Sequence, residues 1–237
     1  MISSTVALRA ASSLVTLNVN VTDRQGRALE RLQQSNFAVF EDGQLQTLDF
    51  FGAEDQPISF GLLIDRSKSM GENGKLENAK AVLYSFLRAG NPQNEAFCLA
   101  FNESSGLVTD FTTDYAGLAA TLGRLWAEGG TALYDGINAG LDNLQRGKHR
   151  RRALIVVTDG LDEHSQTKLA ELLKRIQQSN VQLYLIGFFS PYEAALYQAE
   201  RAKIELNNGQ WVDNPRYAFQ SLAAETGAES FFPRSNA

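Results

Sequence analysis

Two continuous apolar runs in the chain each end abruptly in a carboxylate. Phe60-Gly-Leu-Leu-Ile runs directly into Asp65, and Ala153-Leu-Ile-Val-Val-Thr runs into Asp159. A short apolar run bounded by polar turn residues is typical of a parallel strand that is covered on both faces. The two runs therefore predict buried strands whose carboxyl ends hold Asp65 and Asp159.

Helical periodicity fills the segments between such strands. Leu76, Leu83 and Leu87 recur at the spacing of one helix face, and this pattern ends near Gly90. The other predicted elements are a strand at 95–101, a short strand at 107–109, helices at 114–125, 133–144 and 169–176, a strand at 181–188, a helix at 216–225 and an edge strand at 229–232. Strands that alternate with helices predict an α/β fold, doubly wound, with a mostly parallel central sheet flanked by helices.

Residues 189–213 follow this alternation less clearly. The composition of residues 194–206 favours a helix, whereas residues 207–213 have the polar and glycine-rich character of an exposed loop.

The first part of the chain predicts a small β unit. Residues 14–22 alternate apolar and polar side chains, as a half-buried strand does, and residues 23–26 indicate a turn. A second strand at 37–44 runs into Asp42-Gly43, a strong hairpin signal, and residues 48–51 predict the returning strand.

These patterns divide the chain into three parts. Residues 1–57 form a β-rich leader, residues 58–233 form the main α/β domain, and residues 234–237 are a short tail. Because three strands alone are marginally stable, we expect the leader to pack on the main domain.

Composition and charge narrow the function classes. The 237 residues are 43% hydrophobic and 21% charged, which is ordinary for a globular protein. No apolar stretch approaches the roughly 20 residues of a membrane helix, so we expect no membrane span in this chain. The net charge of −5 argues against a nucleic-acid binder, and the basic run at 146–152 is interpreted as a solvated helix end. The single Cys98, in an apolar strand, excludes an internal disulfide and a cysteine-based zinc site.

Oxygen-bearing side chains gather after the predicted strands. Ser67 and Ser69 follow Asp65 at alternate positions, and a Gly-Gly turn places Thr131 just before a helix. Because ligands bind at the carboxyl ends of strands in an open parallel sheet, we expect these side chains and Asp159 to meet there. An oxygen-only set selects Mg²⁺, Mn²⁺ or Ca²⁺, since softer metals call for Cys or His. Helix capping and turn formation would explain Asp65, Ser67 and Ser69 alone. They would not explain why Thr131 and Asp159 occur at corresponding positions of two further loops.

The motifs Asp-Arg-Ser-Lys-Ser (65–69), Gly-Gly-Thr (129–131) and Thr-Asp-Gly (158–160) resemble the metal-ion-dependent adhesion site of von Willebrand factor type A domains. The resemblance covers roughly residues 58–233. It implies a cation, Mg²⁺ or else Mn²⁺ or Ca²⁺, at Asp65, Ser67, Ser69, Thr131 and Asp159. It also implies a non-enzymatic, adhesion-type function, in which the cation binds a Glu or Asp carboxylate of a partner protein.

The same resemblance assigns roles to other parts of the chain. Arg66, Lys68 and Asp162 flank the motifs and are expected at the rim of the ligand site. Residues 189–213 read as an insertion relative to the family pattern. In related integrin domains the last helix moves on ligation, which here implies residues 216–226.

The leader resembles the segment that precedes this domain in a bacterial subgroup, in the motifs Thr-Asp-Arg-Gln-Gly (22–26) and Phe-Ala-Val-Phe-Glu-Asp-Gly (37–43). Many members of that subgroup look secreted or membrane-anchored, so the resemblance implies an extracytoplasmic protein. The first ten residues do not form a recognisable signal peptide. We therefore expect either an export signal outside this sequence or, if Met1 is the native start, a cytoplasmic protein.

Enzymes provide the alternative reading. A phosphotransferase of the haloacid dehalogenase type would use Asp65 as nucleophile beside Mg²⁺, with further carboxylates from residues 158–162. Those enzymes use a second Asp two residues after the nucleophile, where this chain has Ser67, and a serine is a poor proton donor at pH 7. The chain lacks a Gly-x-Ser-x-Gly elbow and a Gly-x-x-x-x-Gly-Lys loop, which argues against a serine hydrolase and a nucleotide-binding protein.

Overall fold

The main domain is built on one six-stranded sheet. The computed structural model describes residues 17, 19, 21, 23, 29, 31–52, 56–198, 201–206 and 208–233. The strand order is β10-β7-β6-β3-β4-β5, with every neighbouring pair parallel except β4 and β5. The strands are β3 (Ile58–Asp65), β4 (Glu95–Phe101), β5 (Ser105–Thr112), β6 (Arg151–Thr158), β7 (Val181–Gly187) and β10 (Ser230–Phe231). This confirms the predicted mostly parallel sheet.

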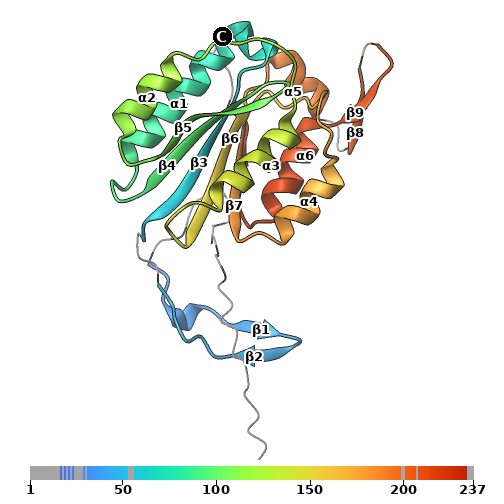
Figure 1. The fold of residues 1–237 in the computed structure, drawn as a ribbon. Helices are drawn as coiled ribbons and strands as arrows, with labels where there is room; N and C mark the ends of the chain where they lie inside the picture. The colour runs from blue at the N-terminus through green and yellow to red at the C-terminus, as the bar shows by residue number, and fades with distance from the viewer. Residues whose placement is uncertain are drawn as a thin grey trace, which may run out of the picture.

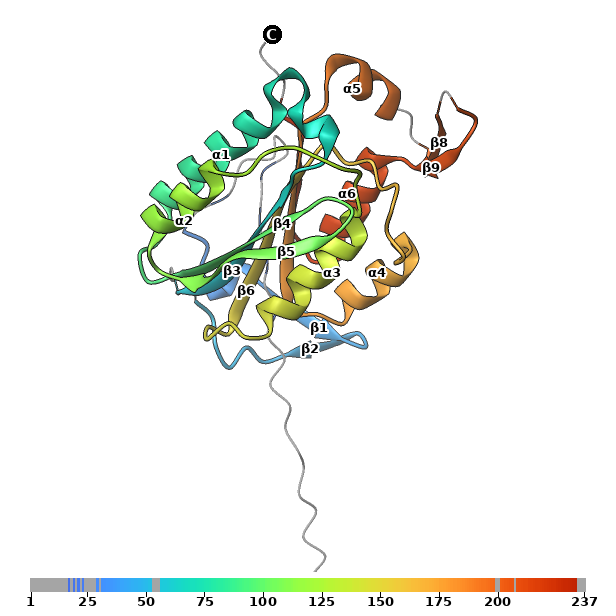
Figure 2. The ribbon, with the colours of Figure 1, turned by 45° about the horizontal axis from the view of Figure 1, so that its top comes forward.

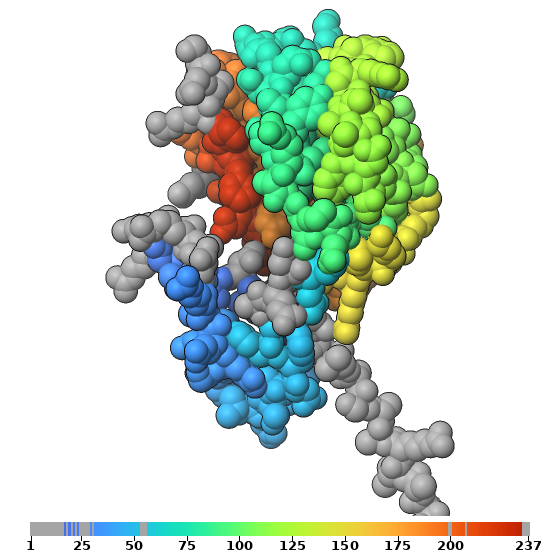
Figure 3. Space-filling model, turned by 90° about the vertical axis from the view of Figure 1, so that its left-hand side faces the viewer, coloured from blue at the N-terminus to red at the C-terminus, as the bar shows by residue number. Residues whose placement is uncertain are grey.

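Helices cover both faces of the sheet (Figures 1 and 2). One face packs on α1 (Lys75–Ala89) and α2 (Tyr115–Gly123), which lie side by side in Figure 3. The other face packs on α3 (Leu133–Leu144), α4 (Leu169–Gln177) and α6 (Pro215–Ala224). Successive residues of β3 point to opposite faces, so Leu62 belongs to the first core and Leu63 to the second. The predicted doubly wound α/β fold is therefore confirmed.

The two strands with terminal carboxylates are neighbours in the centre of this sheet. β3 pairs with β6 from Ile58↔Arg151 to Ile64↔Val157. Both strands are almost entirely buried, which explains their unbroken apolar sequences. Because the pairing is parallel, Asp65 and Asp159 emerge at the same edge.

The leader contains a short hairpin of β1 (Val39–Glu41) and β2 (Gln44–Gln46), beyond the edge where β3 begins (Figure 1). Asp42 and Gly43 have φ of 49° and 78°, the left-handed conformations that a two-residue hairpin turn needs. The chain therefore returns at once, and the predicted returning strand at 48–51 is wrong. The predictions of a strand at 14–22 and a turn at 23–26 fall largely outside the described residues.

Residues 190–213 differ from the sequence prediction. A short helix, α5 (Pro191–Tyr197), is followed by a hairpin of β8 (Lys203–Glu205) and β9 (Trp211–Asp213). The helix expected over 194–206 is confirmed at 194–197 and wrong beyond Tyr197, and the loop expected at 207–213 is wrong at 211–213, where β9 lies. Ser190 caps α5 and Pro191 occupies its first turn, which sets the earlier start. Ile204 and Val212 are buried in the second core, so tertiary packing selects strands here.

Cys98 is buried and free, and burial raises the pKa of its thiol to about 12. Of the helices in the described part of the chain, none has the length and apolar character needed to cross a bilayer.

Candidate metal site

Asp65 organises the first loop of the site. Its side chain is fully buried, and its Oδ1 accepts a hydrogen bond of 2.7 Å from the backbone N–H of Ser67. The chain then enters the 3₁₀ segment η2 (Lys68–Gly74) instead of staying extended. This turn brings the Oγ atoms of Ser67 and Ser69 to 3.2 Å from each other. Three of the predicted oxygen ligands therefore lie together at the end of β3.

The third loop of the site, residues 158–160, is joined to the first loop, residues 65–69, through Thr158. The Thr158 hydroxyl donates to Oδ2 of Asp65 at 2.5 Å and accepts from the backbone N–H of Gly160 at 2.9 Å. Gly160 has φ of 93°, and a Cβ there would lie 2.8 Å from Cβ of Pro215, in the first turn of α6. The chain thus turns sharply just after Asp159, which is itself buried.

The second loop, residues 129–131, is hydrogen-bonded to the chain segments on both sides of it. The carbonyl of Gly129 accepts from the backbone N–H of Lys68 at 2.9 Å, and the carbonyl of Thr131 accepts from Glu163 and His164 at 3.0 Å each. The Thr131 side chain is buried at the start of α3. Backbone hydrogen bonds therefore fix the position of Thr131 relative to both neighbouring loops.

The electrostatics of the site favour a cation. Burial, followed by the charge of Asp159, raises the pKa of Asp65 to about 7. Burial also raises the pKa of Asp159, although Lys75 and the Ser69 hydroxyl act in the opposite direction. Two buried carboxylates that repel each other would both be stabilised by a divalent cation. The donors are oxygens alone, so Asp65, Ser67, Ser69, Thr131 and Asp159 fit Mg²⁺, Mn²⁺ or Ca²⁺.

Clusters of the usual metal-ligating side chains give no competing site. In the ranges that the structure describes, no three His, Cys, Asp or Glu side chains lie close enough to hold a metal ion. The predicted set of ligands has two carboxylates and three hydroxyls, so it is a site of a different composition.

Lys75 is a charged residue of the site that the sequence analysis missed. It begins α1 and is buried, with Nζ 2.8 Å from Oδ2 of Asp159 and 2.9 Å from Oε1 of Glu193. Burial alone would lower the pKa of Lys75, but the charges and hydrogen bonds of Asp159 and Glu193 raise it. A lysine in the first turn of a helix opposes the helix dipole, and this unfavourable position was the signal available in the sequence.

The three predicted rim residues have different surroundings. Arg66 forms an ion pair with Glu128, whereas Lys68 is exposed. Asp162 is half-buried and accepts hydrogen bonds from the Ser165 hydroxyl at 2.6 Å and from the backbone N–H of Tyr134 at 3.3 Å. Asp162 thereby caps the first turn of α3, and burial raises the pKa of its carboxyl.

Three residues near the second loop have different surroundings: Asp135 is hydrogen-bonded, Tyr134 is buried and Trp126 is exposed. Asp135 accepts hydrogen bonds from the backbone N–H groups of Gln166 and Thr167. Tyr134 is buried. Trp126 is 65% exposed, because residues 126–129 lie at the surface next to η2.

A family model describes part of this domain. Residues 61–161, which include all three loops, match the model of the von Willebrand factor type A domain. An uncharacterized protein of Synechocystis is 24% identical over 170 residues, 70% of this chain and 40% of that protein. A second uncharacterized protein, from Borreliella burgdorferi, is 26% identical over 140 residues, 56% of this chain and 41% of the relative. The chain thus spans about two fifths of the length of these curated relatives.

Solved structures share the fold at low sequence identity. A von Willebrand factor type A structure from Catenulispora acidiphila has a TM-score of 0.57 at 19% identity, over 76% of this chain and 39% of that one. The conserved hypothetical protein BatB from Bacteroides thetaiotaomicron has a TM-score of 0.58 at 18% identity, over 74% and 90%. The chain therefore contains a match to the von Willebrand factor type A domain family and has the Rossmann-like fold of that family.

Proposed function

We propose that the protein binds a partner protein through a divalent cation held by Asp65, Ser67, Ser69, Thr131 and Asp159. The observation that supports this most directly is the pair of buried carboxylates beside the hydroxyls of Ser67 and Ser69 at the carboxyl edge of the sheet, with the buried Thr131 on the adjoining loop. Neutral hydroxyls supply most of these donors, so a bound cation would keep part of its charge. A Glu or Asp carboxylate of the partner would complete the coordination, and the family match agrees with such a role.

Binding is better supported than catalysis by the surroundings of Asp65. Its side chain is fully buried, and its two oxygens accept from Ser67 and Thr158. Each oxygen keeps a lone pair for a cation, whereas a nucleophile must also be reached by its substrate, so this buried environment suits a ligand that is held in place. The position two residues later holds Ser67, which is no general acid.

Metal binding is tested by calorimetric titration of Mg²⁺ and Mn²⁺ into protein that has been stripped with a chelator. We expect saturable binding that is lost in Asp65→Ala and in Asp159→Ala. Asp110→Ala is the matched control, because Asp110 is exposed and pairs with Arg146 away from the site. Equal heats in all four proteins, or no binding at all, would contradict the proposal.

Recognition of a carboxylate is tested with acetate, and acetamide serves as its uncharged counterpart. In the Mg²⁺-loaded protein, acetate should shift the NMR signals of residues 65–70, 129–131 and 159–164, and acetamide should not. The shifts that acetate causes should vanish when a chelator removes Mg²⁺. The same samples are assayed with para-nitrophenyl phosphate, and metal-dependent phosphate release that Asp65→Ala abolishes would favour the phosphotransferase reading instead.

A further inference from the structure

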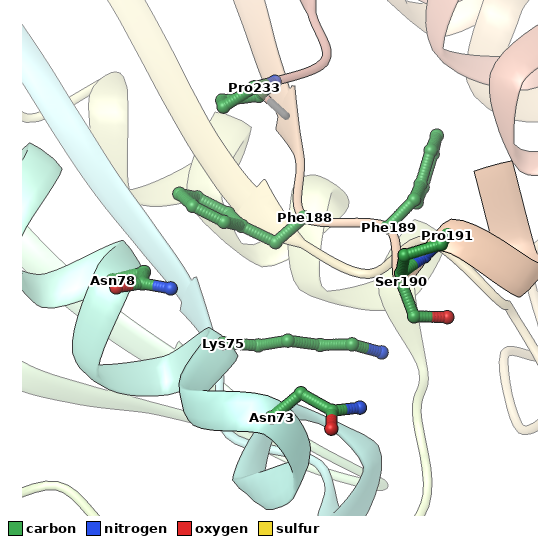
Figure 4. A pocket seen from close by; sticks show the side chains of 8 residues that line it. All are labelled: Asn73, Lys75, Asn78, Phe188, Phe189, Ser190, Pro191 and Pro233. Carbon is green, nitrogen blue, oxygen red and sulfur yellow. The ribbon is translucent and has the colours of Figure 1, made fainter. Parts of the chain in front are cut away.

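Lys75 links the candidate metal site to the expected insertion at residues 189–213. Its ammonium lies between Asp159, one of the proposed ligands, and Glu193 of α5, at 2.8 Å and 2.9 Å. Figure 4 shows the side chain extending from the first turn of α1 between Asn73 and Phe188, toward Ser190 at the start of α5. It borders a cavity of about 30 Å³, about the size of one water molecule. The buried ammonium of Lys75 is therefore shared between Asp159, at the end of β6, and Glu193, in α5.

Glu193 also holds the start of α5 in place. Its Oε2 accepts from the backbone N–H of Ser190 at 2.6 Å, while the Ser190 hydroxyl accepts from the backbone N–H of Glu193. This is a reciprocal capping arrangement, and it leaves Oε1 for Lys75. The position of α5 and the surroundings of the Lys75 ammonium are thus set by the same carboxylate.

The far end of the insertion is bonded to the first turn of α3. The hydroxyl of Tyr134, in the first turn of α3, donates to Oδ2 of Asp213 at 3.1 Å. Tyr134 lies three residues after Thr131. One end of the insertion therefore contacts Lys75, which bonds to a proposed ligand, and the other end contacts a residue close to Thr131 in the sequence.

Charge balance gives this link a consequence. Lys75 offsets the charge of Asp159, and an ammonium beside a ligand carboxylate weakens the attraction of that carboxylate for a divalent cation. Glu193 offsets Lys75 in turn. With Glu193 in contact, the site presents more negative charge to a cation than it does when Lys75 faces Asp159 alone.

We propose that α5 regulates the metal site through Lys75. When α5 is docked, Glu193 shares the ammonium and the cation is retained at Asp159. When α5 is displaced, Lys75 pairs with Asp159 alone and the cation is released. This inference rests on the proposed function of the site and assigns a regulatory role to the insertion.

The test measures the Mg²⁺ dissociation constant of Glu193→Gln by calorimetry. The glutamine oxygen can still accept from Ser190, but the side chain no longer carries the charge that faces Lys75. We expect the dissociation constant to rise about three- to tenfold. Glu225→Gln is the matched control, because Glu225 is an exposed residue that bonds to Gln177 near the end of α6, and it should leave the constant unchanged.

A second arm asks whether the effect passes through Lys75. In a Lys75→Met background, Glu193→Gln should cause no further change in affinity. Hydrogen exchange provides a readout other than affinity: Mg²⁺ should slow exchange of the α5 amides in the wild-type protein. Circular dichroism would show whether Lys75→Met folds. If it does not, the role of α5 is tested by the affinities of Glu193→Gln and Glu225→Gln together with the exchange data.

The outcomes separate the two proposals. If the wild-type protein binds Mg²⁺ and Glu193→Gln binds it equally well, the role of α5 is refuted and the metal site stands. If Mg²⁺ leaves exchange in α5 unchanged, the link is refuted in the same way. If the wild-type protein binds neither Mg²⁺ nor Mn²⁺, the proposed function fails, and the regulatory role fails with it.

Discussion

Asp65 has an unusual environment for a carboxylate. It ends a strand that is buried on both faces, and Asp159 lies close enough to disfavour its ionised form. The hydrogen bonds from Ser67 and Thr158 lower its pKa, yet burial has the larger effect. An ionised Asp65 therefore destabilises the metal-free protein, and a cation would remove that cost.

The stability of the metal-free protein should consequently fall as the pH rises. Asp65 has a folded-state pKa of about 7, above the ordinary value of 3.8, so between these values the folded protein holds a proton that the unfolded chain has lost. Its contribution to the free energy of unfolding is thus lost as the pH rises from about 4 to about 7. We expect Asp65→Asn to reduce this decline by about 2–4 kcal/mol. Urea unfolding in chelator at pH 4.5 and 7.5 measures it, and parallel declines in both proteins would refute the argument.

Gly160 should tolerate a change to alanine less well than an exposed glycine does. Gly160→Ala places a side chain at φ of 93° and a Cβ 2.8 Å from Cβ of Pro215. We expect a loss of about 1–3 kcal/mol of unfolding free energy, together with weaker Mg²⁺ binding because Asp159 precedes it. Gly106→Ala is the control, since a Cβ there meets no atom within 4 Å. Thermal unfolding of both variants tests the difference, and equal melting temperatures would contradict it.

At the scale of elements, the hairpin β8–β9 is bonded to α3 through Tyr134. Tyr134→Phe removes the hydrogen bond to Asp213 and keeps the ring in the core. Loss of one such bond costs about 0.5–1.5 kcal/mol. We expect faster hydrogen exchange in residues 203–213, with smaller changes in the central strands.

The exposed Tyr217 supplies the control for this experiment. Tyr217→Phe removes a hydroxyl from the surface of α6 and should not alter exchange in the hairpin. An unchanged hairpin in Tyr134→Phe would show that the buried Ile204 and Val212 are sufficient to hold it.

Sequence patterns predicted the elements whose structure depends on local periodicity. β3 and β6 were found because both faces of each are buried, which leaves an unbroken apolar run. The start of α2 was found because Asp114 caps it by accepting from Gly117. These signals are contained within a few neighbouring residues.

Elements that depend on distant partners were not predicted correctly. Ile204 and Val212 pair across a hairpin and enter the second core, and this outweighs the helical composition of the segment. The five proposed ligands follow from motifs, and their role as ligands stays a prediction. Lys75 was missed because Asp159 and Glu193, which give it a role, come from strand and helix ends far along the chain.

At the scale of the whole molecule, the main domain has its own cores. Among the described residues, both buried clusters consist of side chains from residue 60 onward, and Phe40, Leu45 and Phe50 of the leader are exposed. The packing of the leader on the main domain therefore stays a prediction.

A fragment of residues 58–233 should fold without the leader. Since both cores remain complete, we expect a cooperative thermal transition within a few degrees of that of the full chain. Circular dichroism and calorimetry on the two proteins measure the difference. An unfolded fragment, or a transition lowered by more than about 10 °C, would show that the leader covers apolar surface of the domain.

The central place of β3 has a mechanical consequence. The leader joins the domain at the beginning of β3, and the candidate metal site begins where the same strand ends. Tension between a bound partner and the preceding chain would therefore pull along the axis of β3. The strand is bonded to β4 and β6 along nearly its whole length, so both ladders would be loaded in shear, with many hydrogen bonds sharing the force at once. The domain should accordingly withstand tension along this line better than a load that peels an edge strand such as β10 from β7.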